Sequence, residues 1–280
     1  MSTSLALPGR AGRPGTAPVG RRVAARLWDL LPPAAVFVGG VLVWELSLLV
    51  TGVQQFILPR PTVIVAALIE EWPVLQRGVV YTGFEALAGL AVGVSLGVAA
   101  AFATARWATA REALMPVAVG ASSIPIIAFA PITSAWFSSE SPASRVAIVT
   151  LMVFFPVMVN TVRGLTTVDP AALELMRSYA ASDAVLLRKV RIPNALPYFF
   201  TALRIAATLA VIGAVIGEYF GGPRFALGIF ITSEAYVFRY ANAWAAILLA
   251  CLLGIGFYLA VLLLERIVMP WHGTQRGADA

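Results

Sequence analysis

Long apolar segments separated by short polar ones dominate this sequence. A membrane-spanning helix needs about 20 mostly apolar residues. Six segments meet that condition, at residues 32–52, 80–104, 113–136, 145–163, 197–219 and 242–264. Their apolar residues follow one another without the strict alternation of a transmembrane strand. The pattern therefore predicts an all-α integral membrane protein with six transmembrane helices.

The two ends of the chain differ from this pattern. Residues 1–27 are rich in Arg, Gly, Pro and Ala and have no apolar period, which predicts a flexible basic leader. Residues 28–270 then form the transmembrane domain, and residues 271–280 form a polar tail.

The composition supports a membrane protein. Hydrophobic residues make up 60% of the 280 residues and charged residues 12%, whereas soluble domains have roughly 45–50% and about 25%. A soluble fold could not cover so much apolar surface. The net charge of +6 does not indicate nucleic-acid binding, because the arginines fall between the apolar segments and form no basic face. The expected partner of the apolar surface is a lipid bilayer.

The distribution of basic residues predicts the orientation, because positively charged loops stay in the cytoplasm. A cytoplasmic N-terminus leaves five basic residues outside and one within the fifth segment. The outside residues are Arg60, Arg77, Arg145, Arg224 and Arg239, and the residue within the segment is Arg204. The other 14 of the 20 are then cytoplasmic. We therefore expect a multi-pass protein of the bacterial plasma membrane with both termini in the cytoplasm.

Three residue types occur once each and exclude several kinds of chemistry. Cys251, His272 and Lys189 are the only cysteine, histidine and lysine. Disulfide frameworks and Cys/His metal sites need more ligands than that. A phosphate-binding G-x-x-x-x-G-K-[ST] loop needs a lysine after a glycine, and Lys189 follows an arginine. We expect no metal site, no bound cofactor and no enzymatic activity, and in particular no ATPase in this chain.

Glycines recur at four-residue spacing in two of the segments. Gly89, Gly93 and Gly97 lie in the second, and Gly213 and Gly217 lie in the fifth. Such stripes allow helices to approach closely. Packing within the subunit is the favoured interpretation, and a subunit interface is the alternative.

Residues 164–196, between the fourth and fifth segments, form the longest loop with helix signals of its own. Asp169 before Pro170 is typical of a helix start. Apolar residues then recur on one face, and a second helix is predicted to begin after Ser182 or Asp183 and to end before Pro193. Two interpretations remain open: a helix pair lying on the bilayer surface, or a projection that docks into a groove of a cytoplasmic partner.

The same loop resembles a known motif. Glu174, Ala180, Val190 and Pro193 have the spacing of the E-A-A-x3-G-x9-I-x-L-P loop of ABC importer permeases, with alanine at the glycine position. Alanine can occupy that position if its backbone dihedral angles are ordinary, so the missing glycine affects only the expectation of a tight turn. Several further motifs are similar to the permeases that import nitrate, sulfonate, taurine and thiamine-pyrimidine precursors. These are Leu-Pro-Arg-Pro at 58–61, Phe-Phe-Pro at 154–156, Leu-Pro-Tyr at 196–198, Leu-Arg at 203–204 and Gly-Glu-Tyr at 217–219.

Two stretches, residues 173–182 and 217–222, look most like the pyrimidine-precursor and riboflavin branch of that family. The resemblance implies a type I ABC importer permease whose 164–196 loop couples to separate ATPase subunits. The residues implied in coupling are Glu174, Arg177, Ala180, Ser182, Val190 and Pro193. Further implied partners are two ATPase subunits that use the ATP, a second permease copy and an extracytoplasmic solute-binding protein. A homodimer is expected, although one chain leaves a heterodimer open.

Polar residues within the apolar segments are candidates for the translocation path, because polar groups in a membrane are costly unless they are partnered or functional. They are Ser122, Ser123, Pro125, Thr133, Asn160 and Glu218. The alternative for the hydroxyl groups is bonding to the backbone of their own kinked helix. Glu85 and Glu45 either pair with an arginine or face a cavity.

Two other functions are weaker alternatives. An ion-gradient-driven carrier or channel normally uses intramembrane carboxylates or histidines as a relay, and this chain offers three glutamates and no histidine within its apolar segments. A membrane enzyme would need an acid, a base and a nucleophile that converge, and no such set is evident.

Overall fold

The computed structural model describes residues 19–122 and 124–270, and this part of the chain is helical with no strand. The all-α prediction is therefore confirmed. The helices are α1 (Val19–Thr51), α2 (Pro61–Glu70), α3 (Trp72–Arg106), α4 (Ala108–Ser122), η1 (Ile126–Phe129), α5 (Ala130–Phe137), α6 (Pro142–Thr166), α7 (Pro170–Ser178), α8 (Asp183–Leu186), the π turn η2 (Leu187–Arg191), α9 (Ile192–Glu218), α10 (Leu227–Tyr236) and α11 (Tyr240–Val268). Residues 1–18, Ser123 and the predicted tail at 271–280 lie outside the described residues.

The chain divides into two compact units at Val53. Helix α1 belongs to the first unit and begins at Val19. Residues 19–27 are therefore helical and not part of an irregular leader, which corrects the prediction; alanine, arginine and leucine in this stretch are good helix formers. From Leu31 to Thr51 the helix is long and apolar enough to cross a membrane.

Among the described residues of the second unit, four continuous helical stretches are long and apolar enough to span a membrane: α3, α6, Asp183–Glu218 and α11. The predicted third span at 113–136 is instead interrupted. Helix α4 ends at Ser122, Pro125 has an extended conformation with ψ 108°, and Pro131 lies in the first turn of α5. Proline has no N–H to donate and restricts the residue before it, so the segment is divided into α4, η1 and α5.

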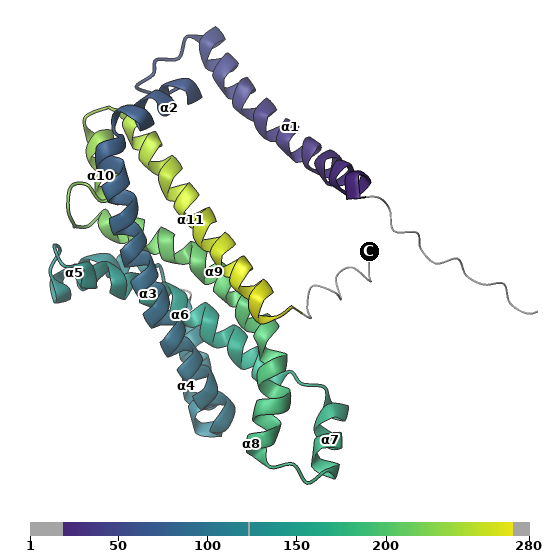
Figure 1. Ribbon diagram of the computed structural model, residues 1–280. Coiled ribbons are helices and arrows are strands. Elements are labelled where there is room, and N and C mark those ends of the chain that lie inside the picture. Colours follow the sequence, from purple (N-terminus) through teal and green to yellow (C-terminus); the bar gives the residue numbers. More distant parts are fainter. Residues whose placement is uncertain (1–18, 123, 271–280) are drawn as a thin grey trace, which may run out of the picture. The chain divides into compact units, whose positions relative to one another are not determined.

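Helix α6 packs along both α3 and α9 and forms the core of this unit (Figure 1). The glycines of α3 lie against valines of α6, and a Cβ atom added to Gly93 would lie 2.9 Å from the Cβ atom of Val153. Gly89 and Gly97 contact Val149 and Val157 in the same way. The glycine stripe of α3 is therefore used inside the subunit, as predicted.

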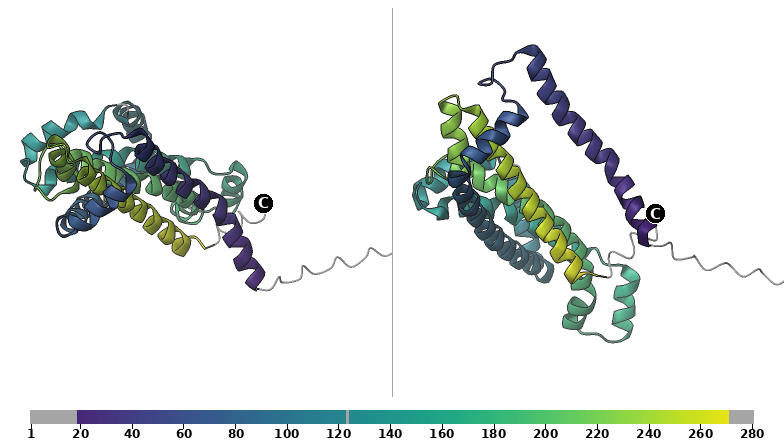
Figure 2. Two further views of the ribbon diagram at one scale, coloured as in Figure 1. Left: turned by 90° about the horizontal axis from the view of Figure 1, so that it is seen from above. Right: turned by 45° about the horizontal axis from the view of Figure 1, so that its top comes forward.

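Helix α11 packs against α9, and Figure 2 shows the two helices side by side. Arg204 of α9 forms an ion pair with Glu265 of α11 at 3.1 Å, and both side chains are largely buried. The arginine that the sequence places within a span therefore has a carboxylate partner on the neighbouring helix.

The helix predicted to end before Pro193 does not end there. Helix α8 continues through η2 into α9, and the helical stretch runs from Asp183 to Glu218. A π turn is wider than an α-helical turn. η2 ends at Arg191, and Pro193 lies in the first turn of α9, where its missing N–H costs nothing, so the chain passes the proline without leaving the helical path.

Candidate functional site

Two features at opposite ends of α9 are candidates for function: the loop that contains α7 and α8, and a buried polar cluster. Figure 1 shows α7 and α8 extending beyond the other helices of the second unit, at the end where α9 begins. The predicted coupling residues all belong to this loop.

The two ends of the loop are held together by hydrogen bonds. Asn194, in the first turn of α9, donates hydrogen bonds from Nδ2 to the carbonyl oxygens of Gly164 and Thr167, each at 2.8 Å. A Cβ atom on Gly164 would lie 2.7 Å from the Cα atom of Ala195, so the end of α6 and the start of α9 are in close contact. The 29 residues between Gly164 and Asn194 therefore project from a closed base.

Helix α7 is held by caps at both ends. The Asp169 side chain accepts a hydrogen bond from the Ala171 N–H at 2.9 Å, which confirms the predicted N-cap. At the other end the Ala180 N–H donates to Arg177 O and the Ala181 N–H donates to Met176 O. These two bonds define a Schellman motif.

Ala180 has a φ angle of 52°, in the left-handed region. The turn at this position is therefore not an ordinary one, and the condition under which alanine replaces glycine without cost is not met. The Schellman motif requires a left-handed residue at this point, where glycine has no steric cost and alanine has one of about 1 kcal/mol. The hydrogen bonds donated by the Ala180 and Ala181 N–H groups hold the alanine in this conformation.

The apolar face of α7 is only partly covered in the described chain, where Ala172 and Met176 are half-buried. None of its residues is buried; Leu175 is 56% exposed, and Tyr179, directly after the helix, is 74% exposed. Glu174, Arg177, Ser182 and Pro193 are also exposed, as is Ala180, and Val190 is half-buried. An amphipathic helix on a fixed base with its apolar side partly uncovered is suited to binding a groove in another molecule.

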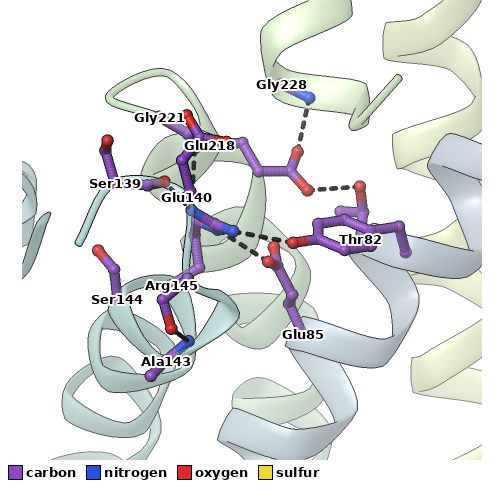
Figure 3. Close-up of polar contacts among 12 residues, drawn as sticks. Thr82, Glu85, Ser139, Glu140, Ala143, Ser144, Arg145, Glu218, Gly221 and Gly228 are labelled. Atoms are coloured by element: carbon purple, nitrogen blue, oxygen red, sulfur yellow. Dashed lines mark hydrogen bonds and ion pairs between the residues drawn. The ribbon is translucent and has the colours of Figure 1, made fainter. Parts of the chain in front are cut away.

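The polar cluster lies at the other end of α9 and centres on Arg145 (Figure 3). Arg145 Nε donates to Glu85 Oε1 at 2.8 Å, and Nη2 donates to the Tyr81 hydroxyl at 2.9 Å. Its Nη1 donates to the carbonyl oxygens of Ser139 at 2.6 Å and Gly221 at 3.2 Å. One side chain thus joins α3, α6 and the turns that precede α6 and follow α9.

Glu218 extends the cluster to α10. Its Oε1 accepts from the Thr82 hydroxyl at 2.7 Å, and its Oε2 accepts from the Gly228 N–H at 2.6 Å. The Leu227 N–H in turn donates to Thr82 Oγ1 at 3.2 Å. Glu85, Arg145, Glu218 and Thr82 are all fully buried.

Two sequence-based assignments change here. Arg145, counted as a charge in an outside loop, is buried within α6. The Ser141–Pro142 pair that starts α6 was the available signal, since it places Arg145 one turn inside the helix. For Glu85, left open between an ion pair and a cavity, the structure shows an ion pair with Arg145.

The other candidate path residues are separated in this conformation. The Thr133 hydroxyl is buried and donates to Ala130 O at 3.0 Å, and Asn160 Nδ2 donates to Pro156 O at 2.8 Å. Both bonds are to the residue's own helix or its start. The Thr133 hydroxyl also accepts from the Ser144 hydroxyl of α6 at 3.4 Å. Pro125 is exposed; Ser123 and the Ser122 side chain lie outside the described residues.

Sequence analysis missed several residues that hold the two features together. Asn194, Tyr81 and Thr82 have no motif of their own, and each acts on a residue far along the chain. Among the described residues no group of three His, Cys, Asp or Glu is placed to hold a metal ion.

Comparison with known proteins connects this architecture to a family. The chain is 34% identical over 255 residues to the formylaminopyrimidine transport permease protein ThiX of Halalkalibacterium halodurans, covering 89% of this chain and 99% of that protein. It is 29% identical over 238 residues to the riboflavin transport system permease protein RibX of Chloroflexus aurantiacus, covering 82% and 86%.

A solved structure, described as the crystal structure of an amino acid ABC transporter with histidines, matches with a TM-score of 0.59. The match covers 71% of this chain and 95% of that one at 15% identity, so it supports the fold alone. The family described as "Binding-protein-dependent transport system inner membrane component" matches residues 93–271. This chain belongs to that family of inner membrane components of binding-protein-dependent transport systems.

Proposed function

We propose that this chain is the permease subunit of an ATP-driven importer and that its 164–196 loop receives the movement of separate ATPase subunits. The observation that carries the proposal is the partly uncovered apolar face of α7 on a loop whose base is closed by Asn194. A helix that only lay on the bilayer would not need such a base. Displacement of α7 is transmitted to α6 and α9 because Asn194 and Gly164 hold these helices together at that point.

The family assignment decides against an ion-gradient-driven carrier or channel, since the family consists of components of binding-protein-dependent systems. An ATPase and a solute-binding protein are therefore the partners of this class of permease. We further propose two ATPase subunits for two copies of this chain, with ATP bound and hydrolysed only by the ATPases. The translocation path then runs between the two permease copies.

The proposed orientation places the α7–α8 loop and both termini in the cytoplasm. The support is the charge of this end: Arg177, Arg188, Lys189 and Arg191 lie within the loop, and Arg163 lies at the end of α6. Positively charged segments remain on the cytoplasmic side.

The proposed solute is a small organic molecule of the pyrimidine-precursor or riboflavin type, with sulfonates, taurine and nitrate as the next candidates. The support is the similarity to ThiX and RibX over more than four fifths of this chain. In such systems the binding protein provides much of the selectivity, so the test uses the binding protein encoded beside this gene. ATP hydrolysis by the reconstituted transporter should rise when that protein carries a pyrimidine or flavin. A rise with taurine or nitrate alone would overturn the solute assignment.

The coupling proposal is tested by crosslinking. Replacing Cys251 by alanine removes the only cysteine, and Ala180→Cys then adds one in the loop without a new steric cost, because alanine already has a Cβ atom. We expect this cysteine to crosslink to the ATPase in the assembled transporter. Ser139→Cys, exposed at the opposite end of α9, is the matched control and should not. The absence of a crosslink from position 180 and also from positions 174, 177 and 182 would refute the docking.

A further inference from the structure

A cavity of about 250 Å³ lies between the end of α3 and the α8–η2 segment. Its polar lining comes from Arg106 on α3 and from Asp183 and Arg191 on the loop side. Its apolar lining includes Phe102, Leu186 and Leu187. The cavity thus joins the last turn of a membrane-spanning helix to the π turn that leads into α9.

The charged groups of this cavity have no partners among the described residues. The ion pairs there join Arg145 to Glu85, Arg204 to Glu265 and Arg239 to Glu234. None of them includes Arg106, Arg191 or Asp183. Two guanidinium groups and one carboxylate therefore line the cavity, with a net charge of +1.

The position of the cavity relative to a bilayer follows from α3. This helix has 35 residues, so it is about 52 Å long and exceeds the hydrocarbon thickness of about 30 Å. Trp107 follows Arg106 directly and is 60% exposed. Exposed tryptophans at helix ends are typical of the membrane–water interface. Arg106 is therefore placed at the depth of the lipid headgroups.

We propose that this cavity binds a membrane phospholipid through its phosphate group. Arg106 and Arg191 bind the phosphate with their guanidinium groups, which match phosphate oxygens in geometry and charge. Asp183 accepts a hydrogen bond from the amine of phosphatidylethanolamine. This headgroup therefore pairs its phosphate with the two arginines and its amine with the carboxylate. Phe102, Leu186 and Leu187 contact the apolar part of the lipid below the phosphate.

The bound lipid links α3 to the loop that carries α7. Removal of the lipid leaves two like charges, Arg106 and Arg191, lining the same cavity, so α3 and the loop side repel each other there. The proposal depends on the membrane location of the chain and not on the solute or on ATPase docking.

Native mass spectrometry of the purified chain, released from nanodiscs of defined composition, tests the proposal. With equal amounts of phosphatidylethanolamine and phosphatidylglycerol, we expect wild-type protein to retain one lipid, with phosphatidylethanolamine preferred. The double variant R106Q/R191Q should retain at least tenfold less of both lipids. The matched control R77Q/R224Q removes the same charge from the other end of α3 and from the turn after α9, and it should retain lipid as the wild type does.

Two further arms keep the test decisive if the double variant is unstable. The single variant R106Q changes an exposed side chain without a partner and should also lose lipid. D183N should keep binding phosphatidylglycerol and lose the preference for phosphatidylethanolamine. Equal lipid retention by wild type and R106Q, or displacement of the lipid by millimolar inorganic phosphate alone, would overturn the assignment of a phospholipid.

Discussion

Removal of the Arg145 side chain should destabilise the second unit by more than any exposed arginine does. Arg145→Met keeps much of the apolar volume and removes four hydrogen bonds, one of them to the buried Glu85 carboxylate. Breaking a buried ion pair by removing one partner costs about 3–5 kcal/mol, because the other charge is left uncompensated. We expect a loss of about 4 kcal/mol in the free energy of unfolding.

The double variant E85Q/R145M separates the charge effect from the lost contacts. It leaves no buried charge at this pair, but Ser139 O, Gly221 O and the Tyr81 hydroxyl still lose their donor. Each lost hydrogen bond costs about 1 kcal/mol. Water that enters the turns can bond to the freed oxygens and so reduces the total cost. The double variant should therefore lose about 2 kcal/mol, less than R145M alone.

Equilibrium unfolding in mixed micelles with increasing SDS, followed by tryptophan fluorescence, measures these differences. Arg224→Met is the control, because Arg224 is exposed and has no ion pair among the described residues. Hydrogen exchange should also rise in R145M at the turns around Ser139 and Gly221, which Arg145 joins. Stability of R145M within 1 kcal/mol of wild type, or a double variant as costly as the two single variants added together, would refute a coupled buried pair.

Three further changes test the packing and the loop. Ala180→Gly removes a left-handed alanine and should raise the thermal stability of the loop by the equivalent of about 1 kcal/mol; a decrease in protection from proteolysis would contradict it. Gly93→Ala brings a methyl group within 2.9 Å of the Val153 Cβ atom and should cost about 1–3 kcal/mol in the same SDS titration, whereas Gly256→Ala, with no atom within 4 Å, should not destabilise. Asn194→Ala opens the loop base and should reduce solute-stimulated ATP hydrolysis severalfold while ATPase binding persists; unchanged stimulation would argue against transmission through this base.

The features predicted correctly from the sequence are those that depend on nearby residues or on long averages. Apolar length predicted the spanning helices, and Asp169 before Pro170 predicted the start of α7, because an N-cap involves residues only two positions apart. The glycine stripe on α3 indicated close packing because spacing alone places those residues on one face.

Proline shows where sequence reasoning was insufficient. Pro125 interrupts a predicted span and Pro131 lies in the first turn of α5, whereas Pro156 and Pro197 lie inside continuous helices and Pro193 follows a π turn. In the first turn of a helix the missing N–H of proline costs nothing, whereas inside a helix it removes a backbone hydrogen bond. Whether the helix continues depends on neighbouring helices that hold it in place, and α6 and α9 lie in the core while η1 and α5 lie at its margin.

The functional clusters depend on contacts between distant residues, which no local pattern reveals. Asn194 bonds to Gly164 from 30 positions away, and Thr82 bonds to Glu218 from 136 positions away. Arg145 looked like a loop charge because hydropathy averages a single arginine at a helix end into the polar flank. Its burial depends on Glu85 lying on the neighbouring helix, which requires the packing of α3 against α6.

Helices α6 and α9 are connected at both ends, with α3 joined to them at one, and this arrangement explains how one loop acts on a distant part of the permease. Asn194 and Gly164 join α6 to α9 at the loop base, and Arg145 with Glu218 joins α3, α6 and α9 at the other end. Between these points the glycines of α3 and α9 bring the helices into close contact with α6, and larger side chains such as Leu90, Phe200 and Leu203 fill the rest of the core. Helices joined in this way move together, so displacement of α7 reaches the turns around Ser139 and Gly221 as a movement of the whole bundle. Weakening either junction should therefore uncouple the two ends while leaving each helix intact.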